Sequence, residues 1–187
     1  MKGSAPGDGP APRSGVRSPL LAAAVLAAAG WLLWGTRQDV SYFASSATPI
    51  DLGDFRALHL ERALPNRLVR ISGPLVGAVG GVGTGGERRR VSGMFGTNLL
   101  VDRPAGASPT TVHEGRLLPA GRQDEYAPFA AELRKQGWEA GDRFMVLREG
   151  ERPRTRYGPP LLAAGLVALG AFNLAFLARR FLPTSGA

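Results

Sequence analysis

Two uncharged apolar stretches, Pro19–Gly35 and Pro160–Ala178, stand near the two ends of this 187-residue chain. They contain 17 and 19 residues and are separated by a much more polar central region. As α-helices that rise 1.5 Å per residue they would reach roughly 25–28 Å, close to the hydrocarbon core of about 30 Å in a bilayer. We therefore expect a protein that crosses a membrane twice and carries one small domain between its spans.

Basic residues predict the orientation of the two spans. They gather on the terminal sides of both stretches, as Lys2, Arg13, Arg17, Arg179 and Arg180. The positive-inside rule then places both termini in the cytoplasm and the central domain in the periplasm or otherwise outside the cytoplasm. Arginines at 148, 152, 154 and 156, just before the second stretch, favour the opposite orientation, but the first span usually governs.

The expected organisation divides the chain into six parts. These are a disordered cytoplasmic tail (1–16), a first transmembrane helix (17–36), an extracytoplasmic β-rich domain (37–150), a connector (151–158), a second transmembrane helix (159–178) and a cytoplasmic tail (179–187). A cleaved signal peptide over 1–47, processed at Ser45-Ser46-Ala47, is the alternative for the first stretch. That stretch is long for a signal peptide and ends about a dozen residues before the site, which favours a retained anchor.

The composition excludes several classes of protein. Arginine outnumbers lysine 21 to 2, which is typical of a GC-rich bacterial genome, so we expect a bacterial inner-membrane protein. No nucleic acid is expected as a partner, because the one dense basic run, Arg88–Arg90, lacks the neighbouring aromatics that such a surface uses. The absence of cysteine excludes disulfides and thiolate metal sites.

Small and aromatic residues in the spans predict how the helices meet lipid and protein. Trp31, Trp34 and Tyr157 are expected at the membrane interfaces. Asn173 is expected to bond another helix or the backbone. A face of small residues, predicted to pack on a partner helix unless alanine is merely common here, comprises Ala164, Ala168, Ala171 and Ala175.

The central region predicts short strands and one or two short helices. Helices are expected over Phe55–Leu64, capped by Asp51–Asp54, and over Glu125–Gln136, and strands over Arg67–Val76 (bent at Gly73-Pro74), Arg88–Phe95, Leu99–Asp102, Thr110–Leu118 and Arg143–Arg148. About five short strands, one of them bent by glycine, are typical of a small closed or partly open β-barrel, with an OB-like form preferred. The expected fold class is thus an α+β membrane protein in which two transmembrane helices flank an OB-like barrel.

Few residue patterns in this sequence indicate a catalytic or ligand-binding site. The stretch Gly77–Gly86 contains a formal G-x-G-x-x-G, but a strand follows it rather than a helix, so a flexible hairpin loop is expected rather than a phosphate cradle. A weaker hypothesis has its amides and the neighbouring arginines meeting an anionic lipid headgroup. The two histidines, His59 and His113, lie on different predicted elements, and no metal site, catalytic set or bound cofactor is expected.

The expected order of membrane anchors and barrel resembles that of two protein families. A tethered barrel followed by Gln123–Pro128, with Tyr126 and Pro128, resembles the periplasmic haem chaperone of cytochrome c maturation. Where that family attaches haem through histidine, this sequence has Gly121 or Arg122. The order of anchor, barrel and anchor is similar to the surfeit locus protein 1 family of cytochrome oxidase assembly factors, without its tryptophan–glutamine and arginine–glycine–tryptophan signatures.

These observations lead to two hypotheses. The first is a non-enzymatic envelope protein, held in the lipid bilayer, whose barrel binds or scaffolds another membrane or envelope protein, as in the assembly of a membrane complex. The alternative is a carrier of a cofactor or small ligand in the barrel mouth, using His113 and Tyr126 together with the glycine-rich stretch.

Overall fold

A computed structural model describes residues 19–58, 64–82, 86–118, 123–141 and 143–181 of the chain. The expected tail 1–16 therefore lies outside the described residues, as does His59. The chain forms two compact units, one of residues 1–35 and 162–187 and the other of residues 36–161. The elements in chain order are α1 (Pro19–Phe43), β1 (Ile50–Asp54), the 3-10 helix η1 (Phe55–Ala57), β2 (Leu68–Ser72), β3 (Leu75–Val82), β4 (Arg88–Met94), β5 (Leu99–Pro104), β6 (Val112–Leu118), α2 (Gln123–Lys135), β7 (Met145–Glu149) and α3 (Gly158–Phe181).

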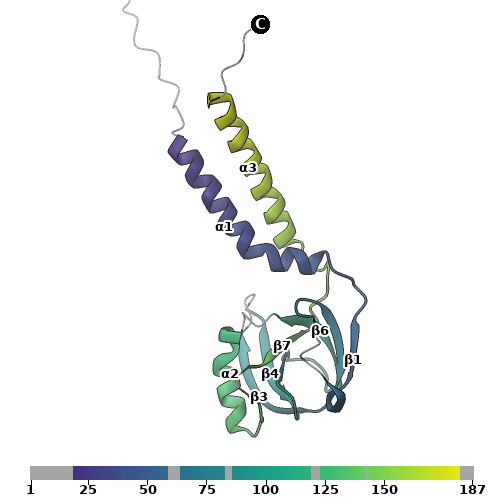
Figure 1. Cartoon of the computed structure of the whole chain (residues 1–187). Helices are drawn as coiled ribbons and strands as arrows, with labels where there is room; N and C mark the ends of the chain where they lie inside the picture. Colours follow the sequence, from purple (N-terminus) through teal and green to yellow (C-terminus); the bar gives the residue numbers. More distant parts are fainter. Residues whose placement is uncertain (1–18, 59–63, 83–85, 119–122, 142, 182–187) are drawn as a thin grey trace, which may run out of the picture. The chain divides into compact units, whose positions relative to one another are not determined.

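The larger unit is an α+β domain built on one mixed sheet of seven strands (Figure 1). The strand order is β1-β2-β6-β7-β5-β4-β3, with parallel pairs at β1–β2 and β5–β7 and antiparallel pairs elsewhere. Strands β1 and β3 stand at the two ends of this order, so the sheet is not closed. The closed form of the expected barrel is therefore not what is found.

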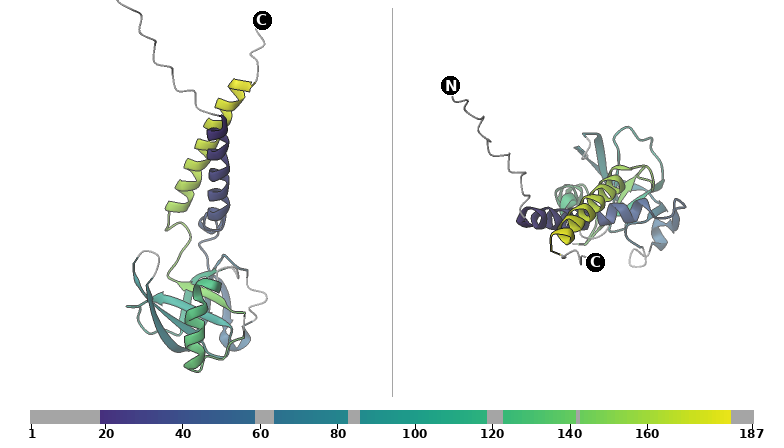
Figure 2. Two further views of the ribbon diagram at one scale, coloured as in Figure 1. Left: turned by 90° about the vertical axis from the view of Figure 1, so that its left-hand side faces the viewer. Right: turned by 90° about the horizontal axis from the view of Figure 1, so that it is seen from above.

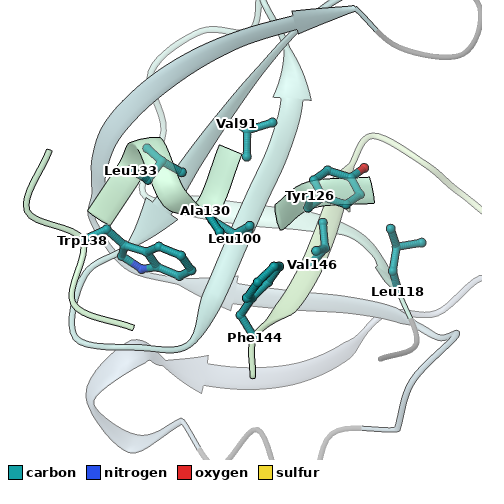
Figure 3. Packing of buried hydrophobic residues seen from close by; sticks show 9 residues of the cluster. All are labelled: Val91, Leu100, Leu118, Tyr126, Ala130, Leu133, Trp138, Phe144 and Val146. Atoms are coloured by element: carbon teal, nitrogen blue, oxygen red, sulfur yellow. The ribbon is translucent and has the colours of Figure 1, made fainter. Parts of the chain in front are cut away.

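Hydrophobic side chains fill both faces of the sheet centre. The first cluster lies beneath α2 and includes Val91, Leu100, Leu133, Trp138 and Val146 (Figure 3). The second lies on the other face and is formed by residues that alternate with those of the first along the same strands, such as Leu99, Val101 and Leu147. Successive side chains of a strand point to opposite faces, so β5 buries its first four residues in succession and no residue of β7 is fully exposed.

Most of the expected strands are confirmed, including the bend. Gly73 and Pro74 separate β2 from β3, so the predicted strand over Arg67–Val76 changes direction where its sequence cannot continue a regular ladder. The hairpin of β4 and β5 and the strands β6 and β7 follow the predicted ranges closely. The predicted helix over Glu125–Gln136 is found as α2.

Two predictions for the start of the domain were wrong. Asp51–Asp54 lies in β1 and pairs in parallel with β2, instead of capping an α-helix. The helix that follows is a single 3-10 turn, η1, and Leu58 after it is already extended. Asp54 still accepts a hydrogen bond from the Arg56 amide at 3.0 Å, so its capping chemistry serves a shorter element. Residues 59–63 of the predicted helix lie outside the described residues.

The glycine-rich stretch is mainly a strand and not the predicted loop. Residues 77–82 belong to β3 and pair with β4, while residues 83–85 lie outside the described residues. Gly77 has φ +65° and stands at a shift in the register between Val76 and Val79. A Cβ at Gly77 would lie 2.8 Å from Leu133 Cδ2, so this bulge under α2 requires glycine.

In the smaller unit, α1 and α3 lie side by side (Figure 2). Both are long and apolar enough to cross a membrane, and only 11% and 6% of the most apolar window in each is buried. A cavity of about 360 Å³ between them is lined by residues of both helices, including Ala22 and Asn173. The Asn173 amide donates to the Leu169 carbonyl at 2.8 Å, in keeping with the expected bond to the backbone.

Candidate functional site

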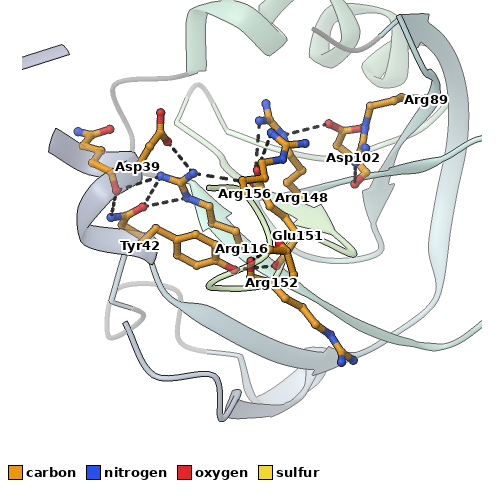
Figure 4. Close-up of polar contacts among 12 residues, drawn as sticks. Asp39, Tyr42, Arg89, Asp102, Arg116, Arg148, Glu151, Arg152 and Arg156 are labelled. Carbon is orange, nitrogen blue, oxygen red and sulfur yellow. Dashed lines mark hydrogen bonds and ion pairs between the residues drawn. The ribbon is translucent and has the colours of Figure 1, made fainter. Parts of the chain in front are cut away.

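A network of charged side chains, most of them buried, links strands β4, β5 and β6 to the end of α1 (Figure 4). It begins at Asp102 on β5, whose side chain is only 4% exposed. Arg89 on β4 donates from Nε to Asp102 Oδ1 at 2.7 Å and from Nη2 to the Asp102 carbonyl at 3.0 Å. This two-point contact is possible because β4 and β5 are adjacent, with Val91 opposite Asp102 in the register.

Tyr126 connects Asp102 to the next arginine of the network. Its hydroxyl donates to Asp102 Oδ2 at 2.8 Å and accepts from Arg148 Nη2 at 2.9 Å. Burial raises the pKa of Tyr126 to about 12, with Arg148 acting in the opposite direction. The neutral phenol is thereby held as a hydrogen-bond relay between a carboxylate and a guanidinium.

Glu151 joins this first half of the network to a second half. One of its oxygens, Oε2, lies 4.0 Å from Nη1 of Arg148 and 4.0 Å from Nη1 of Arg116. Its other oxygen, Oε1, pairs with Arg156 at 2.9 Å. Because the Glu151 side chain is 5% exposed, these three guanidiniums offset the cost of burying its charge.

Arg116 on β6 is held by residues from the end of α1. Its Nη1 lies 2.7 Å from Asp39 Oδ1, and its guanidinium stacks 4.5 Å above the centre of the Tyr42 ring. The Tyr42 hydroxyl in turn donates to the Glu151 carbonyl at 2.7 Å. Asn66 accepts two more bonds from Arg116, at 2.6 and 2.9 Å. The last turn of α1 thus belongs to the domain, and the predicted connector is packed against it.

Two cavities flank this network, and Arg148 and Arg156 line both. The first has about 190 Å³ and is bordered by Tyr126, Asp102, Arg89 and the end of β3. The second has about 230 Å³, and most of its lining is charged. Its residues are Asp39, Tyr42, Phe43, Arg116, Arg148, Glu151, Arg152, Arg154, Arg156 and Pro159.

His113 and Tyr126, the two residues of the carrier hypothesis, have separate surroundings. His113 is fully buried on β6, with Nε2 at 3.3 Å from the Gly73 carbonyl and Nδ1 at 3.7 Å from Glu149 Oε2. Tyr126 lines the first cavity, and His113 lines neither of the two. Among the described residues no group of three or more histidine, aspartate or glutamate side chains could hold a metal ion.

The residues predicted for the spans are mostly on open surfaces. Trp31, Trp34 and Tyr157 are exposed, and the Tyr157 ring meets Phe43 edge to face at 5.3 Å. The face of small residues stays a prediction for a helix of another protein. Its members, all exposed, are Ala164, Ala168, Ala171 and Ala175.

The buried charge network was missed by sequence reasoning. In the sequence, arginines 148, 152, 154 and 156 indicate only charges that flank a span, and the segment after Glu149 indicates a stiff connector. The available signal was their density next to Glu151. The other members of the network, Asp39, Asp102 and Arg116, lie far away in the sequence, where no short-range pattern connects them.

A scan against protein-family models, a search of curated proteins and a search of solved structures each found no match to this chain. The resemblances to the haem chaperone and to the surfeit locus protein 1 family therefore stay predictions.

Proposed function

We propose that this protein is a non-enzymatic, two-span protein of the bacterial inner membrane whose extracytoplasmic domain binds or scaffolds a partner in the assembly of a membrane complex. The observation that carries the anchoring is that the domain is continuous at both ends with an apolar helix. Large apolar side chains on these helices are exposed, among them Leu20, Trp31, Leu161 and Phe172. Lipid is the solvent in which such surfaces are stable.

We also propose that the domain is a partly open OB-like barrel. In this arrangement β2 and β3 act as one long strand, bent at Gly73-Pro74. It pairs with β6 through β2 and with β4 through β3, while β5 and β7 pair in parallel. The second hydrophobic cluster supports the curvature, because it joins Leu52 near one end of the strand order to Leu75 at the other. Side chains on one face of a flat seven-stranded sheet would lie too far apart for that.

Exposed apolar residues of the domain support a partner-binding role. Val82 at the end of β3 is 75% exposed and Phe95 in the β4–β5 turn is 55% exposed. Large apolar side chains placed singly on a surface are common, but residues of this kind anchor protein interfaces when a partner covers them.

Site-specific photo-crosslinking in native membranes tests this role. A photoreactive amino acid placed at Val82 or Phe95 of the full-length chain should give one discrete crosslinked product, and exposed Glu139 is the control position. Changing the other apolar residue to serine should remove the product if the two share a partner. Products no stronger than those from Glu139 would refute the role.

The carrier function receives support from one residue only. Tyr126 lines a cavity, but its hydroxyl is already bonded on both sides, and His113 lies among other partners. Absorbance in the haem region of the purified full-length protein would favour this function over the scaffold.

A further inference from the structure

The second cavity carries an excess of positive charge. Five arginines line it, Arg116, Arg148, Arg152, Arg154 and Arg156, against the two carboxylates of Asp39 and Glu151. Tyr42, Phe43 and Pro159 complete the wall and give it an apolar side. An excess of guanidinium groups in a concave, partly desolvated site favours an anion.

The excess is concentrated at Arg152 and Arg154. The buried arginines, 116 and 148, are paired with Asp39 and with the Asp102–Tyr126 pair. Arg156 is paired with Glu151. The Arg152 guanidinium pairs only with Glu114 among the described residues, at 3.1 Å, and Glu114 also pairs with Arg70 at 2.7 Å. For Arg154, the part of the chain that the structure describes provides no ion-pair partner.

Two further features mark this cavity as a binding site. Arg154 has φ +63°, a left-handed conformation that is uncommon for a residue with a side chain, so the turn holds it at some cost. Glu151 Oε2 is buried and has no hydrogen-bond partner among the described residues, although it lines the cavity. Buried acceptors of this kind are usually satisfied, so this oxygen keeps an unused capacity to accept a hydrogen bond.

We propose that this cavity binds a phosphate ester, with Arg152 and Arg154 holding the phosphate oxygens and Glu151 accepting from a neighbouring hydroxyl. Arginine presents several N–H donors in a planar fork, which matches phosphate oxygens, and charge-assisted bonds of this type are short and strong. The inner arginines stay with their carboxylates, so binding competes only with the pair of Arg152 and Glu114.

The phosphate has two possible sources, a phospholipid headgroup or a soluble phosphate ester. Phe43 ends α1 and Pro159 lies in the first turn of α3, so the headgroup source rests on the membrane anchoring proposed above. A headgroup such as phosphatidylglycerol offers both a phosphate and hydroxyl donors. The soluble source requires no membrane.

The test uses the full-length protein, purified in a neutral detergent, and a double variant Arg152→Gln/Arg154→Gln. The matched control is Arg67→Gln/Arg143→Gln, which removes the same charge from two exposed arginines outside the cavity. Phosphatidylglycerol, phosphatidylcholine and glycerol phosphate are added separately. Native mass spectrometry then counts the bound molecules, and thermal unfolding measures the stabilisation that binding confers.

Phosphatidylglycerol should bind the wild type and the control at least about tenfold more tightly than the double variant, because bonds to charged groups are lost. Binding of glycerol phosphate without binding of phosphatidylglycerol, with the same dependence on Arg152 and Arg154, would support the site and identify a soluble source. Equal binding by the double variant and its control, or failure of both phosphatidylglycerol and glycerol phosphate to bind the wild type, would overturn the proposal. A double variant that unfolds without ligand is replaced by the single Arg154→Gln variant, whose side chain supports no described ion pair.

Failure of this test is distinguishable from failure of the membrane assignment. Extraction of membranes with alkaline carbonate tests whether the two apolar helices are embedded in lipid, and its result does not depend on the cavity. The glycerol phosphate arm examines the cavity whether or not the helices cross a bilayer.

Discussion

At the residue scale, the Tyr126 hydroxyl is the central link of the buried network. Burial raises its pKa from 10.0 to about 12, Asp102 adds to this, and Arg148 opposes it. Because the pKa is higher in the folded state, the contribution of the neutral hydroxyl is complete below pH 10 and is lost as the pH rises through about 12. As the pH rises from 10 to about 12, the free energy of unfolding should fall by up to about 2 kcal/mol more in the wild type than in Tyr126→Phe.

Denaturant unfolding of the full-length protein in detergent measures both effects. At neutral pH, Tyr126→Phe should lose about 1–3 kcal/mol, because Asp102 Oδ2 keeps only Arg148 Nε at 3.6 Å. Tyr157→Phe is the control, since the exposed Tyr157 ring keeps its contact with Phe43 as phenylalanine. If the free energy of unfolding depends on pH in the same way in the wild type and in Tyr126→Phe, ionisation of this hydroxyl does not destabilise the folded protein.

A second residue-scale prediction concerns the contact between β4 and the segment after α2. A Cβ at Gly93 would lie 2.2 Å from Trp138 Cδ1, and Trp138 is buried with Nε1 bonded to the carbonyls of Met94 and Thr97. Gly93→Ala should therefore destabilise the protein by about 1–3 kcal/mol through overpacking. Gly106→Ala, where the added Cβ meets nothing within 4 Å, should be nearly neutral in the same unfolding experiment.

At the element scale, the strand order predicts a gradient of hydrogen-exchange protection. Strands β5 and β7 are central and carry a hydrophobic cluster on each face, so their amides should exchange slowest. Strand β1 pairs on one side only among the described strands and is mostly exposed, so it should exchange fastest of the seven. Exchange measured by mass spectrometry on the full-length protein checks this. Protection of β1 equal to that of β5 would contradict its end position.

The elements also show what the sequence could and could not predict. Alternation and glycine or proline breaks located β4 to β7 and the bend before β3, because these signals are local. The segment Asp51–Asp54 has capping residues but forms β1, since pairing with β2 outweighs a weak helical preference.

The glycine-rich β3 was missed because its strand depends on β4 and on contact with α2, including Phe129 against Gly81. The charge network joins residues as distant in the sequence as Asp39 and Arg156, which no periodicity encodes.

At the scale of the whole molecule, the decisive property is the environment of α1 and α3. If both cross the bilayer, the protein should stay in the pellet when membranes are washed with alkaline carbonate and dissolve only in detergent. The helices hold 25 and 24 residues, enough to span with some tilt. Release into the carbonate supernatant would refute the two-span arrangement and the compartment inferred from it.

The orientation of the domain can be measured because the chain contains no cysteine. A single cysteine at Ser108, in the exposed segment between β5 and β6, should react with a membrane-impermeant maleimide added to spheroplasts. One at Ser185, beyond the second span, should react only after the membrane is opened, because two crossings return the chain to the cytoplasmic side. The four arginines at 148–156 favour the opposite result, so the experiment weighs them directly against Lys2, Arg13 and Arg17. Labelling of Ser185→Cys but not of Ser108→Cys in intact spheroplasts would place the domain in the cytoplasm, and with it the arginine-lined cavity.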